Sequence, residues 1–259
     1  MKSAQRAGTW IPSRDLLLTL MERKLRLLSK RAWVGVAFPI VAPLLALALY
    51  FFVFHQVFTV SIDNYWIYLC AGLLPWTFLA QTLPDASASL TTEADLIRRS
   101  AFRYELLPIA AVSALTIHFV ITMFGFVIVL AAIGHLNAAV LPVLVVPIIC
   151  LYLLVTTLAM LLALVDVYNR DVRRFMGNLL TIWFFLVPIV YSQTRVQALI
   201  FLRYIDPINI LVSEFRAILY YNSLPAVHTL VEGSAICIGI FVGAIAVYRR
   251  FDDRLPREV

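Results

Sequence analysis

The sequence predicts an all-α polytopic membrane protein, a single transmembrane domain over residues 1–259 with six membrane-spanning helices. Hydrophobic residues make up 62% of the chain and charged residues 14%, whereas soluble domains average roughly 45–50% and about 25%. The hydrophobic residues form long runs instead of alternating with polar ones, which favours helices over a transmembrane barrel. Basic residues are concentrated in alternate connecting segments, which orients the predicted helices.

An amphipathic helix is expected over residues 13–31, ahead of the first hydrophobic run. Leucines recur at helical spacing along SRDLLLTLMERKLRLLSKR, and basic residues cover much of the remaining surface. Ser13 suits the N-cap, and Asp15 would lie in the first turn. A basic amphipathic helix beside a membrane span is typical of the cytoplasmic membrane interface. Packing against a soluble partner would suit the same helix.

Six hydrophobic segments are long enough to cross a membrane. About 20 apolar residues span a hydrocarbon core of ~30 Å. The third and fourth segments must therefore tilt or extend beyond the core, and the fifth is the shortest. Prolines within these segments free backbone carbonyls that a neighbouring helix or water must satisfy. The segments cover residues 34–54, 66–84, 106–134, 139–165, 175–192 and 230–249.

The positions of lysine and arginine predict that both termini are cytoplasmic. Of the 21 basic residues, all but Arg195, Arg203 and Arg216 lie on the same side as the N-terminus in this topology. Cytoplasmic connecting segments of membrane proteins carry such an excess of Lys and Arg.

The polar segment 87–104, SASLTTEADLIRRSAFRY, is predicted to be a cytoplasmic coupling loop. A charged segment between two spans must lie in water or against another protein. We interpret it as a contact with another protein, and a merely solvated loop is the alternative. If the segment is helical, Asp95 stands three and four residues before Arg98 and Arg99, where it could pair with either.

The connection 193–227 is predicted to form two short helices that dip back toward the membrane on the outer side. Pro207 follows Asp206, and hydrophobic residues recur at helical spacing in NILVSEFRAILYY. Non-helical backbone at membrane depth must be buried in protein or line a water-filled space. The segment is therefore a candidate gate, with an ordinary packed lid as the alternative. Its candidate gate residues are Asp206, Pro207, Glu214 and Arg216.

The sequence offers little support for an enzyme. All three lysines precede residue 31, so the chain has no lysine for a phosphate-binding P-loop. Its histidines form no metal-ligand pair, and its three cysteines lie in apolar runs. Carboxylates are nearly absent from the spans, which disfavours a carrier driven by an ion gradient.

Five short motifs occur in order along the chain: SRDLLLTLMERKLR with PLLALALYFFVF, CAGLLPWTFLAQ, ADLIRRSAFRYELLPIA, VDVYNRDVRRF, and FFLVPIVYS with DPINILVSEFRAIL. Together they resemble the membrane subunit of type-2 ABC exporters for bacterial surface polysaccharides: O-antigen, capsule and teichoic acid. The chain has Asp206-Pro207 where the family usually has Asn-Pro, and Asn169 where the family has an aromatic residue.

This resemblance implies a complex of two copies of the chain with two copies of a separate P-loop ATPase. ATP and Mg would be bound by that partner, and this chain would hold no cofactor or metal. The complex would move a lipid-linked polysaccharide across the inner membrane, and the long outer loop would be the docking surface of any periplasmic export partner. A membrane transferase or an ion-driven flippase acting on polyprenyl-linked sugars is the alternative function. The residues implied in coupling to the ATPase are Glu93, Asp95, Arg98, Arg99, Arg103, Arg170 and Asp171.

Four aromatic residues are candidates for contact with the transported glycan: Trp76, Trp183, Phe184 and Tyr191. An aromatic wall can stack on the apolar face of a sugar ring and let a polymer slide. Tryptophan and tyrosine also collect at membrane interfaces without any ligand. That second explanation is weaker for Trp183 and Phe184, which lie inside the fifth hydrophobic segment.

Overall fold

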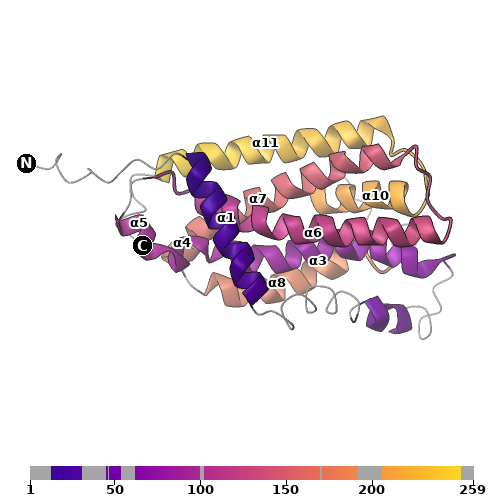
Figure 1. The fold of residues 1–259 in the computed structure, drawn as a ribbon, viewed down its shortest axis with the longest axis horizontal. Helices are drawn as coiled ribbons and strands as arrows, with labels where there is room; N and C mark the ends of the chain where they lie inside the picture. Colours follow the sequence, from indigo (N-terminus) through magenta and orange to yellow (C-terminus); the bar gives the residue numbers. More distant parts are fainter. Residues whose placement is uncertain are drawn as a thin grey trace, which may run out of the picture.

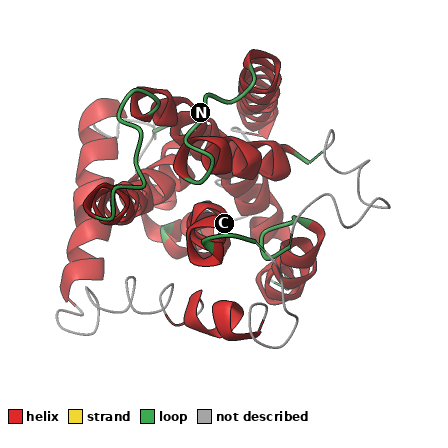
Figure 2. Cartoon of the chain, turned by 90° about the vertical axis from the view of Figure 1, so that its right-hand side faces the viewer, coloured by secondary structure: helices red, strands yellow, loops and turns green. Residues whose placement is uncertain are grey.

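The structure is a computed structural model that describes residues 13–30, 45, 47–53, 62–99, 102–169, 171–191 and 206–251. Every regular element within these ranges is helical, which confirms the all-α class (Figure 2). The helices are α1 (Ser13–Lys30), α3 (Tyr65–Ser87), α4 (Ser89–Thr92), α5 (Ala94–Arg99), α6 (Leu106–Ala132), the 3₁₀ turn η2 (Leu141–Leu144), α7 (Val145–Tyr168), α8 (Val172–Leu186), α10 (Pro207–Leu219) and α11 (Val227–Phe251).

Four of these helices are long and apolar enough to cross a membrane. They are α3, α6, the continuous helix of η2 and α7, and α11, which match the expected second, third, fourth and sixth spans. The expected first span, 34–54, lies mostly outside the described residues. In the expected fifth span, 175–192, the helix α8 begins earlier, at Val172, and ends at Leu186, because the backbone of Val187 is extended. At 1.5 Å per residue α8 is about 22 Å long, shorter than a membrane core.

The four long helices run side by side (Figure 1). Most of α3 is buried against α6, α7 and α10, whereas α6 and α11 leave large apolar side chains on the outside. Phe124 and Ile121 of α6 and Val231 and Val242 of α11 are all more than half exposed. An apolar surface of this extent suits a lipid environment.

The two ends of the bundle differ in chemistry. One end, here called the charged end, holds α4, α5 and the beginning of α8, and α1 crosses the bundle obliquely nearby (Figure 1). The opposite end, here called the α10 end, holds α10 and the turn between α6 and η2. The described part of α1 packs Leu16 and Leu20 inward and exposes Arg14 and Arg26, as expected of an amphipathic helix.

Candidate functional site

Two ion pairs fasten α1 to the charged end. Arg23 Nη1 lies 2.8 Å from Glu93 Oε2, between α4 and α5, and Lys24 Nζ lies 2.6 Å from Asp85 Oδ2 near the end of α3. These residues border a cavity of about 140 Å³ beneath α1. Both pairs are partly exposed, so each contributes only about 0–1 kcal/mol. Their main effect is to fix the position of α1 relative to the 87–104 segment.

The 87–104 segment is folded against the bundle. Its residues form the short helices α4 and α5, and Leu90, Ile97 and Tyr104 are buried in a cluster with residues of α7 and α11. The segment around Asp95 is helical, as the expected pairing of Asp95 with Arg98 or Arg99 requires. The side chains of both arginines lie outside the described residues, so the pairing stays a prediction.

The expected coupling residues occupy different environments. Glu93 is half-buried in its ion pair, whereas Asp95 is exposed. Arg103 lies 2.6 Å from the buried carboxylate of Glu105. Asp171 is exposed and has only a loose contact of 3.5 Å with Arg174, and Arg170 is outside the described residues.

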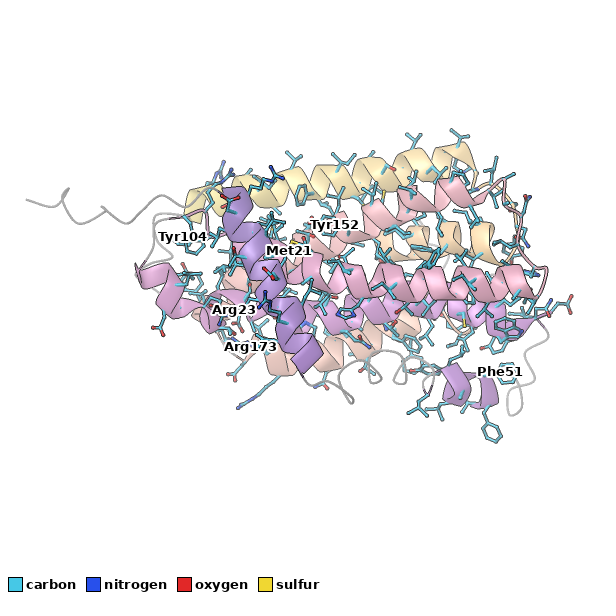
Figure 3. All side chains as sticks on the ribbon, viewed as in Figure 1. Met21, Arg23, Phe51, Tyr104, Tyr152 and Arg173 are labelled. Atoms are coloured by element: carbon cyan, nitrogen blue, oxygen red, sulfur yellow. The ribbon has the colours of Figure 1, made fainter. Side chains whose placement is uncertain are left out.

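A buried polar cluster at the charged end was not anticipated from the sequence. Asp166, near the end of α7, is fully buried and accepts a hydrogen bond of 2.6 Å from Arg173 Nε of α8. It also accepts one of 2.9 Å from the hydroxyl of Thr91 on α4, and that hydroxyl accepts a third from Arg173. The hydrogen bond to Asp166 raises the pKa of Arg173. Figure 3 shows Arg173 and Arg23 at this end of the bundle.

Asp206 and Pro207 begin α10. Asp206 Oδ1 accepts a hydrogen bond of 3.1 Å from the Ile208 amide, and Pro207 occupies the first turn, where its missing N–H has no intrahelical role. The other carboxylate oxygen accepts a 2.8 Å bond from the indole Nε1 of Trp183 on α8. The unusual aspartate is therefore an effective N-cap that also joins two helices.

Arg216 of α10 is buried and binds the backbone that follows α8. Its Nη1 donates to the Pro188 carbonyl at 2.6 Å and its Nη2 to the Ile189 carbonyl at 2.5 Å. The guanidinium lies 3.7 Å from the centre of the Tyr68 ring, within cation–π distance. Gly72 of α3 leaves room for it, since a Cβ there would lie 3.0 Å from Nη2.

The irregular backbone at 187–191 has its carbonyl groups paired within the protein. In addition to the two carbonyls held by Arg216, the Tyr65 hydroxyl donates to the Val190 carbonyl at 2.7 Å and the Tyr68 hydroxyl to the Tyr191 carbonyl at 3.0 Å. Four successive carbonyls are therefore paired by side chains of α3 and α10. Irregular backbone at membrane depth requires such pairing.

Glu214 of α10 is buried without a partner. Its side chain is 1% exposed, and neither carboxylate oxygen has a hydrogen-bond partner among the described residues. It faces Gly233 of α11, where a Cβ would lie 2.9 Å from Oε1. Burial raises the pKa of Glu214 to about 8. Arg216, two residues further along α10, projects toward α3 and not toward this carboxyl group.

Three of the four aromatic candidates lie close to one another at the junction of α3 and α8, and the fourth, Tyr191, donates its hydroxyl to the Phe185 carbonyl at 2.8 Å. The ring of Trp76 is 5.8 Å from Trp183 and 5.6 Å from Phe184. Trp76 and Phe184 are buried, whereas Trp183 and Tyr191 are half-buried. Trp183 also borders an apolar groove of about 500 Å³ between α3, α7 and α8. Contact with glycan stays a prediction for all four residues.

Comparison with known proteins supports the resemblance seen in the motifs. The chain is 26% identical over 251 residues to a Myxococcus xanthus protein named O-antigen export system permease protein RfbA, an alignment that covers 95% of this chain and 96% of that protein. Two Klebsiella pneumoniae proteins of the same name are each 26% identical over 184 residues, 70% of this chain and 71% of theirs. No family model matches the chain. These relatives confirm the resemblance to a permease subunit of a polysaccharide exporter.

Proposed function

We propose that this chain is the membrane-spanning subunit of an ATP-driven exporter that moves a lipid-linked polysaccharide, an O-antigen or a capsular polysaccharide, across the bacterial inner membrane. The observation that carries the proposal is the similarity to O-antigen export permeases along 95% of the chain. The four apolar helices and the separation of a charged end from the α10 end are consistent with it. The apolar groove between α3, α7 and α8 has a lining suited to a lipid chain.

The energy would come from a separate P-loop ATPase, two copies of which would bind two copies of this chain together with ATP and Mg. The charged end is the surface proposed for that contact. Asp95 and Asp171 are exposed there, whereas Glu93 is bound to Arg23 of α1. ATPase closure would consequently move α1 and the 87–104 segment together.

The α10 end is proposed as the outer gate. Asp206 and Pro207 begin α10, and Glu214 and Arg216 seat it against α11 and α3. The packed position of α10 against α11 and α3, here called its seat, includes a buried carboxyl group with no hydrogen-bond partner among the described residues. This unpaired group makes the packed position less stable than an apolar side chain would.

Purification of the chain from its native membrane in a mild detergent tests the proposal. We expect a soluble P-loop subunit in equal amount, and loss of surface polysaccharide from cells in which the chain is deleted. Recovery of the chain alone, in a detergent that keeps other ABC complexes intact, with surface polysaccharide unchanged by the deletion, would contradict the proposal. That result would favour a transferase or an ion-driven flippase.

A further inference from the structure

Helix α8 packs against the bundle along one narrow stripe. Its buried side chains are Met176, Leu180 and Phe184, at intervals of four residues. Phe175 and Ile182, on the other side, are more than half exposed. Since so little of α8 is held by packing, the polar contacts at its two ends matter for its position.

At the charged end, α8 is bound to both α4 and α7. Arg173, its second residue, donates to Asp166 at 2.6 Å and to the hydroxyl of Thr91. Thr91 lies in the 87–104 segment, 75 residues before Asp166. Because Asp166 is fully buried, loss of its partners would leave an uncompensated charge, and this contact should persist when the segment moves.

Near its other end, α8 is bound to Asp206, the N-cap residue of α10, and the backbone directly after α8 is bound to Arg216 of the same helix. The indole N–H of Trp183 donates to the N-cap carboxylate of Asp206 at 2.8 Å. The bond is specific, because the second oxygen of that carboxylate is used by the backbone of α10. A displacement of α8 along its axis therefore acts directly on the start of α10.

We propose that α8 moves as a rigid helix and transmits movement of the 87–104 segment to α10. Thr91, Asp166 and Arg173 link α8 to that segment. Trp183 and Asp206 link α8 to α10. This inference rests on the proposed function and deepens it. An α-helix of 15 residues is stiff over its length of about 22 Å. The five residues are positioning residues, and none of them needs to contact the ATPase or the glycan.

Three substitutions each break one link without disturbing the fold. Thr91→Val keeps the shape of the side chain and leaves the pair of Asp166 and Arg173 intact. Trp183→Phe keeps an aromatic ring but removes the N–H donor. Asp206→Ser keeps an N-cap acceptor but is too short to reach the indole. Thr181→Val is the matched control, because that exposed hydroxyl on α8 bonds only to the Gly177 carbonyl of its own helix.

The measurement is the amount of polysaccharide exported per ATP hydrolysed by the complex. We expect each of the three variants to lower this ratio at least fivefold, while ATP hydrolysis stays within about twofold of wild type and Thr181→Val behaves as wild type. The double variant Thr91→Val/Trp183→Phe should lose no more than the worse single variant, because links in series fail together. The proposal would be overturned if the fold-loss in export per ATP of the double variant equalled the product of the two single losses. It would also be overturned if each loss of export were matched by an equal loss of ATP hydrolysis.

The same experiment separates this inference from the proposed function. If wild-type chain neither copurifies with an ATPase nor restores export in deleted cells, the proposed function fails. If wild type restores export and Thr91→Val, Trp183→Phe and Asp206→Ser all behave like Thr181→Val, the transmission role of α8 alone is wrong. A defect in Trp183→Phe that Asp206→Ser does not share would assign Trp183 to glycan contact and also reject the link.

Discussion

Acid conditions are expected to hold α10 in its seat, because Glu214 has to be uncharged there. Its carboxyl group is buried, and the titratable groups that face it are the thiols of Cys150 on α7 and Cys237 on α11. Neither can supply a positive charge, so burial favours the protonated form and raises the pKa of Glu214 to about 8. When α10 leaves the seat, water solvates the carboxyl group and its pKa returns to the ordinary value of about 4.3.

The sign and the size of the effect follow from proton linkage. The seated state binds a proton that the detached state releases, so the stabilisation is fully present below about pH 4.3 and is lost as the pH rises through about 8. Between these limits each pH unit changes the free energy of seating by about 1.4 kcal/mol. The ratio of seated to detached α10 should therefore fall about tenfold between pH 6 and pH 7.

Distance measurement between two spin labels would test this expectation. Labels on cysteines placed at Tyr221 and Val231, which are both exposed, report whether α10 lies against α11. Glu214→Gln should stay seated with no dependence on pH from 5 to 8, and Glu232→Gln, at an exposed position of α11, should keep the wild-type slope. A wild-type distance distribution that is constant over this range, or a slope that survives in Glu214→Gln, would refute the reasoning.

Three further predictions concern the seat and the charged end. Gly233→Ala should destabilise the protein by roughly 1–3 kcal/mol, because the added Cβ would crowd Glu214. The change would be measured as a lower melting temperature in detergent. Gly239→Ala on the same helix is the control and should leave the melting temperature unchanged, because a Cβ there meets open space. Arg23→Glu should weaken the attachment of α1 by about 1 kcal/mol through repulsion, and Glu93→Arg in the same chain should restore it, seen as a decrease and recovery of a cross-link between α1 and the segment that follows α4. Asp95→Ala should lower export per ATP while membrane insertion stays unchanged; unaltered export would reject its coupling role.

Local patterns in the sequence were sufficient to predict several elements of the fold. The leucine spacing of residues 13–31 predicted α1, and the hydrophobic spacing of NILVSEFRAILYY predicted the helix now seen as α10, because helical periodicity depends on neighbouring residues alone. Pro188 lies in the break after α8, but the groups that stabilise this break come from Tyr65, Tyr68 and Arg216, which are far away in the chain.

The buried polar cluster at the charged end could not be predicted either, because its residues come from distant parts of the chain. Thr91 and Asp166 are 75 residues apart, and no periodicity of either segment brings them together. One signal was present: Asp166 is an acid at the end of an apolar run, with an arginine seven residues later. Buried charge requires a partner. That rule could have linked Asp166 to Arg173, but not to the hydroxyl on α4.

The two faces of α10 are held in different ways, and this difference indicates how the helix would move. Toward α3, Arg216 makes two charge-assisted hydrogen bonds and a cation–π contact, so separation would leave both the guanidinium and two carbonyls unpaired. Toward α11, Glu214 makes no polar contact within the described part of the chain and gains solvation on leaving. Detachment is consequently easier on the α11 side. Asp206 is bound to Trp183 of α8 and Arg216 to the backbone directly after α8, so an axial movement of α8 would pull on α10 at both points, and the contact with α11 would separate before the contact with α3.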